Sequence, residues 1–248
     1  MSGAIMVTES TRRQASTSRP WYSPPWYSQG GLALRATAIL LLTLLLVIPF
    51  GRAARADDPR GIFIYAVSRD GAPIGQQRME FVNDGEKLRV LSHTELEVTL
   101  LGMSLYGFNQ QVEEVRSNGK IVSLTSEADD DGTDRKVNLN LQGDMLKGAY
   151  NDNDRIIDPK LITSLFWQKP QTGETQLIDT LRGKVKDVNV KDLGPETLTL
   201  AVGRIEAHHY QMTGEWKRDL WYDANGILVA GELEKDGAKI RQELQQRP

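Results

Sequence analysis

Short runs rich in β-branched and aromatic residues, separated by pairs of turn-forming residues, constrain this chain more than any other feature. The runs begin at Gly61 and continue to the C-terminus at the close spacing of antiparallel strands joined by tight turns. Asn118-Gly119 and Asn225-Gly226 are the clearest turns, because both residue types tolerate positive φ. The sequence therefore predicts a mostly β fold, a strongly curved antiparallel sheet or half-open β-barrel of about ten to twelve strands.

One interruption of this pattern predicts a helix. Between Arg155 and Gln171 the alternation fails, and Asp158-Pro159-Lys160 precedes an apolar stretch. Proline is favoured in the first turn of a helix, so we expect one short helix here, with Leu161, Leu165 and Trp167 facing inward.

Several predicted strands are apolar on both faces. In the run 61–67 neither face is clearly polar, whereas a sheet with one wet face alternates strictly. Two interpretations remain open, a well-filled core or a curved sheet that encloses a ligand cavity. The ligand-binding candidates are the large apolar and aromatic residues Met103, Leu105, Tyr106, Phe108, Leu165, Phe166, Trp167, Trp216 and Trp221.

The most apolar stretch of the β region is 98–108, VTLLGMSLYGF. It is typical of two strands that cross a core and bend at a glycine. Alternatively, it is a hairpin tip that inserts into a ligand mouth, a partner or a membrane surface.

The N-terminal region predicts export. An uncharged run, ATAILLLTLLLVIPF at Ala36–Phe50, follows Arg35 and precedes the small-x-small site Ala54-Arg55-Ala56. The run is short for a membrane-spanning helix, which favours a cleaved signal over a retained anchor. We therefore expect a leader at 1–35, a signal-peptide h-region and cleavage site at 36–56, and a single antiparallel β domain at 57–248. The expected location is the periplasm, with no stable membrane anchor after cleavage near Ala56.

Charge and cysteine content narrow the classes of partner and chemistry. Residues 1–56 carry six arginines and one glutamate, a net charge of +5. Since the whole chain has a net charge of −3, residues 57–248 have a net charge of −8. A surface at −8 repels polyanions, and nucleic acid is therefore a poor partner. The chain contains no cysteine, which excludes thiol chemistry and a lipoprotein anchor.

No motif in the sequence points to a catalytic residue, a metal or another cofactor. Adjacent His208 and His209 point to opposite faces of a strand and cannot chelate one ion. The acidic turn 127–134 matches the start of a calcium loop, but its twelfth position is Asn138 rather than glutamate. A second acidic cluster, at 151–154, has the same ambiguity, because acidic residues are also ordinary turn residues.

Three segments resemble a family of uncharacterised exported proteobacterial proteins that are classified as a domain of unknown function. They are 113–132, 178–185 and above all 220–229, LWYDANGILV. The resemblance covers roughly 61–244 and implies the fold and the compartment without an activity. The closing hairpin is more distantly similar to those of periplasmic lipoprotein carriers, which implies an open half-barrel with an apolar concave face around a helix.

The sequence thus favours an exported, non-enzymatic protein whose curved sheet binds a hydrophobic or lipid-like small molecule, or an envelope protein. The alternative is a structural or scaffolding module with a filled core and no small ligand. A hydrolase with an unconventional carboxylate site is a third hypothesis.

Overall fold

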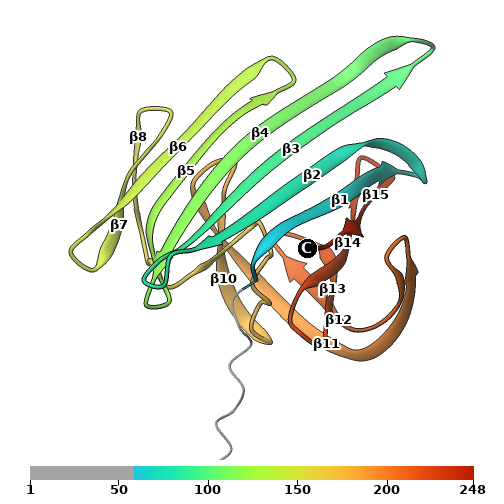
Figure 1. Cartoon of the computed structure of the whole chain (residues 1–248). Coiled ribbons are helices and arrows are strands. Elements are labelled where there is room, and N and C mark those ends of the chain that lie inside the picture. The colour runs from blue at the N-terminus through green and yellow to red at the C-terminus, as the bar shows by residue number, and fades with distance from the viewer. Residues whose placement is uncertain (1–58) are drawn as a thin grey trace, which may run out of the picture. The chain divides into compact units, whose positions relative to one another are not determined.

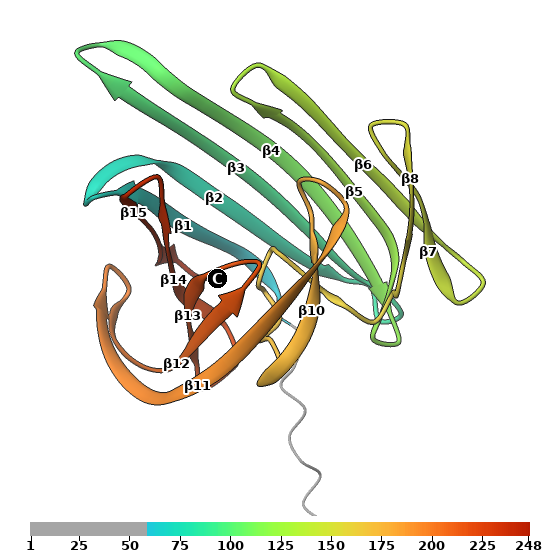
Figure 2. The same ribbon diagram turned by 180° about the vertical axis from the view of Figure 1, so that it is seen from behind.

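The computed structural model describes residues 59–248, and these residues form one sheet of fifteen strands. The sheet is open and strongly curved (Figures 1 and 2). Its strands, in chain order, are β1 (Gly61–Arg69), β2 (Ala72–Asn83), β3 (Leu88–Leu100), β4 (Met103–Ser117), β5 (Lys120–Asp130), β6 (Thr133–Gln142), β7 (Met145–Tyr150), β8 (Asn153–Ile157), β9 (Ile162–Thr163), β10 (Gly173–Asp179), β11 (Lys184–Leu200), β12 (Gly203–Gly214), β13 (Arg218–Asp223), β14 (Leu228–Lys235) and β15 (Ala238–Gln246).

The sheet consists of two meanders, which are joined where β1 pairs with β15. Strands β1 to β8 each pair antiparallel with the next strand, and so do β10 to β15. Between the two meanders, β1 pairs antiparallel with β15, with Val67 opposite Gln242. The remaining pair, β9 with β10, is parallel. The curved, mostly antiparallel sheet predicted from the sequence is thereby confirmed.

Turn chemistry explains why the meanders form. Asn118 and Gly119 both have positive φ, 51° and 77°, at the β4–β5 turn that the sequence predicts. In β11 the pairing shifts by one residue between Asp192 and Gly194, which forms a bulge. A bulge bends and twists its strand. The β11–β12 hairpin accordingly curls strongly in Figure 1.

The strand count exceeds the prediction, because three short strands, β7, β8 and β9, lie close to the acidic cluster at 151–154. Asn151 and Asp152 have φ of 41° and 66° and form the turn of the β7–β8 hairpin. In the β5–β6 turn, the Asp129 carboxylate accepts a hydrogen bond from the Gly132 amide at 2.6 Å. Both acidic segments therefore act as turns. No group of three or more histidines or acids is arranged to hold a metal ion among residues 59–248.

The predicted helix is wrong: the part of the chain that the structure describes contains no helix. The segment between β8 and β10 contains the two-residue β9 with a turn on either side, at 159–160 and 164–165. Its backbone forms two isolated turns, and other groups bond to neighbouring strands: the Ser164 amide donates to the Ile178 carbonyl at 2.8 Å. It follows that these residues contain no helix that is long and apolar enough to cross a bilayer.

This segment contributes to two hydrophobic clusters. Leu165 and Trp167 join the larger cluster, which includes Phe63, Phe81 and other residues of both meanders. Phe166, with φ of 54°, joins the smaller cluster of β10 to β14. All three side chains are buried. We call residues 158–172 the plug segment; its side chains belong to both clusters. The predicted leader and signal peptide lie outside the described residues.

A candidate ligand cavity on the concave face

The concave face of the sheet contains a half-open cavity of about 450 Å³. It is bounded by β1 to β4 on one side and by β13 to β15 on the other, with the plug segment and the turn after β10 between them. The apolar and aromatic lining residues are Val67, Ile74, Leu96, Val98, Tyr106, Phe108, Leu165, Leu181, Trp216, Leu233 and Ile240. The polar and charged ones include Arg69, Gln77, Thr94, Gln110, Ser164, Asp179, Thr180, Arg182, Arg218, Glu232, Lys235, Asp236 and Gln242.

Strand register arranges these side chains in layers. Gln77, Thr94 and Gln110 lie opposite one another on β2, β3 and β4. Two residues further along each strand, Leu96 lies opposite Phe108. Because residues i and i+2 share a face, the polar and apolar layers both face the cavity. A polar layer therefore forms the floor, and an apolar layer lies above it.

Hydrogen bonds between neighbouring strands satisfy much of the polar floor. The Gln242 side-chain amide donates to Gln77 Oε1 at 2.6 Å, and Gln77 donates in turn to Ser92 Oγ at 3.0 Å. The Gln110 amide donates to Ser126 Oγ at 2.9 Å. The floor is thus fixed before any ligand arrives, which lowers the entropic cost of binding.

Tyr106 occupies the rim of the cavity in a polar network. Its hydroxyl donates to Asp130 Oδ1 at 2.9 Å, and Asp130 forms an ion pair with Arg135 at 2.7 Å. Burial, together with the hydrogen bond to Asp130, raises the pKa of Tyr106 well above its usual range. The Lys235 ammonium lies 5.3 Å from the centre of the Tyr106 ring. The rim therefore combines an aromatic face with a cation.

Two buried or half-buried charges lie deeper in the wall. Asp179 is 1% exposed, and its Oδ1 accepts the Leu181 amide at 2.9 Å. Its Oδ2 atom has no hydrogen-bond partner in the described part of the chain, and the nearest cation is Arg182 Nη1 at 3.8 Å. Arg218 is half-buried, with its guanidinium 4.9 Å from the centre of the Phe166 ring.

A buried ion pair anchors the plug segment that supplies Leu165 to the cavity. Glu114 is fully buried and accepts a hydrogen bond from Arg116 Nε at 2.5 Å and another from Thr163 Oγ1 at 2.6 Å. Arg116 also donates to the Leu161 carbonyl at 2.6 Å. These bonds fix both sides of β9 to β4.

The structure brings together four of the nine ligand-binding candidates. Tyr106, Phe108, Leu165 and Trp216 line the cavity. Phe166 and Trp167 are buried in the two clusters and do not line it. Trp221 also lies outside the cavity lining, buried against His209. Met103 and Leu105 are 62% and 55% exposed and also lie outside it.

Sequence reasoning missed the polar half of the cavity. Gln77, Thr94 and Gln110 resemble the solvent face of a strand, because a polar residue that alternates with apolar ones normally faces water. The pairing register of the strands would have placed these residues on the cavity face, but the register depends on the turns of three hairpins at once.

His209, one of the two adjacent histidines, lies outside the cavity. His209 Nε2 is 2.8 Å from Asp219 Oδ1, and Nδ1 is 3.4 Å from Glu196 Oε2. Its ring stacks on Trp221 with a centroid separation of 4.3 Å. None of these four residues lines the cavity, so the two carboxylates hold His209 against the tryptophan rather than toward an enclosed site.

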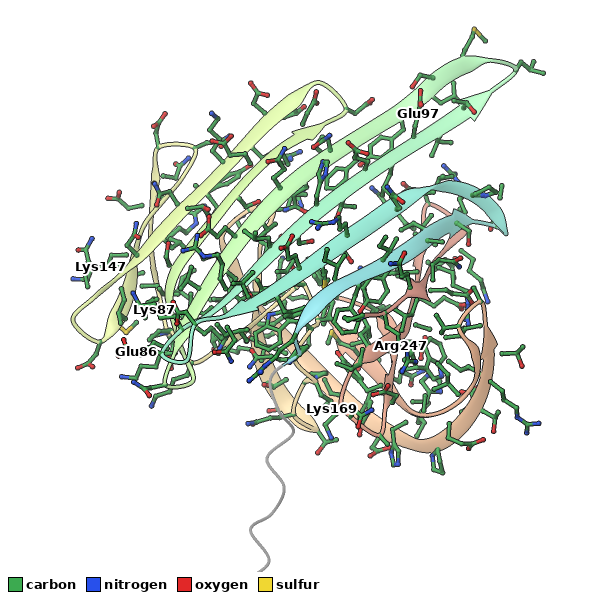
Figure 3. The ribbon with its side chains drawn as sticks, viewed as in Figure 1. Glu86, Lys87, Glu97, Lys147, Lys169 and Arg247 are labelled. Carbon is green, nitrogen blue, oxygen red and sulfur yellow. The ribbon has the colours of Figure 1, made fainter. Side chains whose placement is uncertain are left out.

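The β3–β4 hairpin projects beyond its neighbours (Figures 1 and 2). Its last pairing with β2 is at Leu96, so Glu97, labelled in Figure 3, lies where the hairpin begins to extend alone. At the turn, Leu101 is 91% exposed and has φ of 52°. With Met103 and Leu105 it forms an exposed apolar tip, which we call the hairpin tip.

Comparison with known proteins identifies the fold and the family. The chain is similar to a crystal structure described as a β-barrel-like protein of domain of unknown function DUF1849 from Brucella abortus, with a TM-score of 0.55 and 11% identity. The match covers 75% of this chain and 97% of that one, and at this identity it shows the fold alone. No curated protein matches the chain. The model of the family DUF6134, a domain of unknown function, matches residues 65–245, and the chain therefore belongs to this family.

Proposed function

We propose that this chain is an exported, non-enzymatic binding protein of the bacterial envelope whose curved sheet holds a hydrophobic or lipid-like ligand. The observation that carries the proposal is the half-open cavity of about 450 Å³, which has an apolar layer above a hydrogen-bonded floor. Small-molecule sites have this character, being concave and mostly apolar with a few placed polar groups. The uncharged run and small-x-small site near Ala56 support export to the periplasm.

Native mass spectrometry of the protein purified from the periplasm tests the proposal directly. We expect a stoichiometric adduct that organic solvent extracts as an apolar small molecule. A bare protein mass, together with no saturable binding of an environment-sensitive apolar dye, would overturn the proposal. The scaffolding alternative would then lead.

A cavity-filling substitution provides a matched comparison. Leu233→Trp places a large ring in the cavity, whereas Ile156→Trp makes a similar aliphatic-to-tryptophan change on an exposed strand outside it. We expect Leu233→Trp to reduce dye binding at least about tenfold, because the ring occupies the ligand volume. Ile156→Trp should bind dye as the parent protein does. Equal binding by both variants would place the dye outside the cavity.

A second candidate function, docking to an envelope protein, is favoured by the hairpin tip. Its three exposed apolar side chains project on a hairpin that neighbouring strands do not support, and exposed apolar patches often mark interaction sites. Photo-crosslinking from position 103 in intact cells should give one discrete adduct that Leu101→Asp abolishes. The same adduct from position 156 would contradict docking through the tip.

A further inference from the structure

Arg218 is a charged residue of the cavity wall. Its guanidinium forms no ion pair with any carboxylate of residues 59–248, although this part of the chain is rich in acids. Arg182, on the same cavity wall, does have an acid nearby, Asp179 at 3.8 Å. An arginine that faces a cavity without an acidic partner presents its N–H donors to water or to a ligand.

Keeping this cation in the wall is costly. Desolvation lowers the pKa of Arg218 to about 10, opposed only by the field of Tyr222. The Phe166 ring, with its centre 4.9 Å from the guanidinium, compensates in part through a cation–π contact. Because Arg218 is only half-buried the penalty is partial, but an uncharged side chain of similar length would avoid it.

The neighbours of Arg218 are mostly apolar. Trp216 precedes it by two residues and lines the same cavity, as does the opposed pair Leu233 and Ile240 on β14 and β15. The guanidinium therefore lies beside an apolar wall. This arrangement matches a molecule with one charged end and one hydrocarbon end.

We propose that the ligand is an amphiphile with an anionic, oxygen-bearing head group, and that Arg218 forms an ion pair with that head group. The proposal rests on the proposed function, because it assigns a chemical class to the ligand of the same cavity. The guanidinium fork matches both carboxylate and phosphate, with two parallel N–H···O bonds. The hydrocarbon part then packs on Leu233, Ile240 and the apolar layer of β3 and β4.

Calorimetric titration of the purified protein with three probes of equal chain length tests the assignment. Dodecanoate and dodecyl phosphate carry the two candidate head groups, and dodecanol carries none; all are used below their aggregation limits. We expect at least one anionic probe to bind about tenfold or more tightly than dodecanol, as for a charge-assisted bond formed out of water. The tighter of the two anions identifies the head group.

Two variants separate Arg218 from the general positive charge of the cavity. Arg218→Met should abolish the preference for the anion and leave dodecanol binding unchanged. Lys235→Met removes the same charge from the exposed part of the rim and should retain most of the preference. A preference that survives in Arg218→Met, or that both variants lose equally, overturns the role of Arg218.

The outcomes for the two proposals are distinguishable. If all three probes bind the parent protein equally, the anionic head group is wrong and the apolar cavity function stands. If none binds, the cavity function fails as well. Thermal melting of Arg218→Met is the folding control, and we expect a melting temperature no lower than that of the parent, because a desolvated charge is removed. A melting temperature that falls sharply would make Arg218 a structural residue held by Phe166 and overturn its role in binding.

Discussion

At the scale of the residue, neighbouring glutamates on β4 have opposite environments. Glu114 points inward, is fully buried, and holds Arg116 and Thr163. Glu113 points outward and pairs with Arg89 at 2.7 Å, where both side chains are substantially exposed. Strand β4 therefore carries a buried ion pair beside a surface ion pair. The stability lost when each pair is broken can be compared directly.

Glu114→Gln should destabilise the protein by about 3–5 kcal/mol, because the neutral amide leaves the buried Arg116 uncompensated. Glu113→Gln should change stability by less than about 1 kcal/mol, because its pair is solvated. Urea denaturation of both variants measures the two free energies of unfolding. Similar costs for the two would show that the plug segment does not depend on the buried pair.

At the scale of the element, the turn of the β3–β4 hairpin has an unfavourable residue. Leu101 has φ of 52° and is followed by Gly102 at 80°, nearly the geometry of Asn118 and Gly119 in the next hairpin. Asparagine tolerates this conformation, whereas leucine clashes with its own backbone. Because Leu101 is 91% exposed, packing does not compensate for the strain.

Leu101→Asn should therefore stabilise the protein by about 1 kcal/mol. The reciprocal change, Asn118→Leu, should cost a similar amount, since the two turns have nearly the same φ values. Denaturant titration of both variants gives the comparison. A neutral Leu101→Asn beside a destabilising Asn118→Leu would mean that the hairpin tip is not strained.

The elements also show how far sequence patterns reach. Asn118-Gly119 predicted the β4–β5 turn correctly, because the turn preference of these two residues is local. Pro159 followed by apolar residues predicted a helix wrongly, because the choice there depends on carbonyls such as that of Ile178 on a strand formed later in the chain. In the same way aromatic candidates such as Tyr106 and Phe108 were within reach of the sequence, whereas Gln77 and Arg218 needed the three-dimensional register.

At the scale of the whole molecule, the seam between β1 and β15 joins the two meanders. Leu244 lies in this seam opposite Tyr65, is fully buried, and belongs to the larger hydrophobic cluster. Because the core continues across the seam, we expect both meanders to unfold together.

Leu244→Ala should cost about 2–5 kcal/mol, the usual effect of a cavity in a packed core. Far-ultraviolet circular dichroism and tryptophan fluorescence should report the same shifted transition, as they do for two-state unfolding. Two separate transitions in the variant would show that the meanders are independent folding units. Val82→Ala, at an exposed position on β2, is the control and should leave the transition almost unchanged.

The pairing of β1 with β15 also sets the order of events during synthesis. The first strand of the described sheet emerges from the ribosome long before its partner, and it exposes a free edge until nearly the whole chain is available. The concave wall that combines β1 to β4 with β13 to β15 cannot close earlier than that. In a chain with this topology, the sheet that spans both meanders is therefore complete only after β15 has been made.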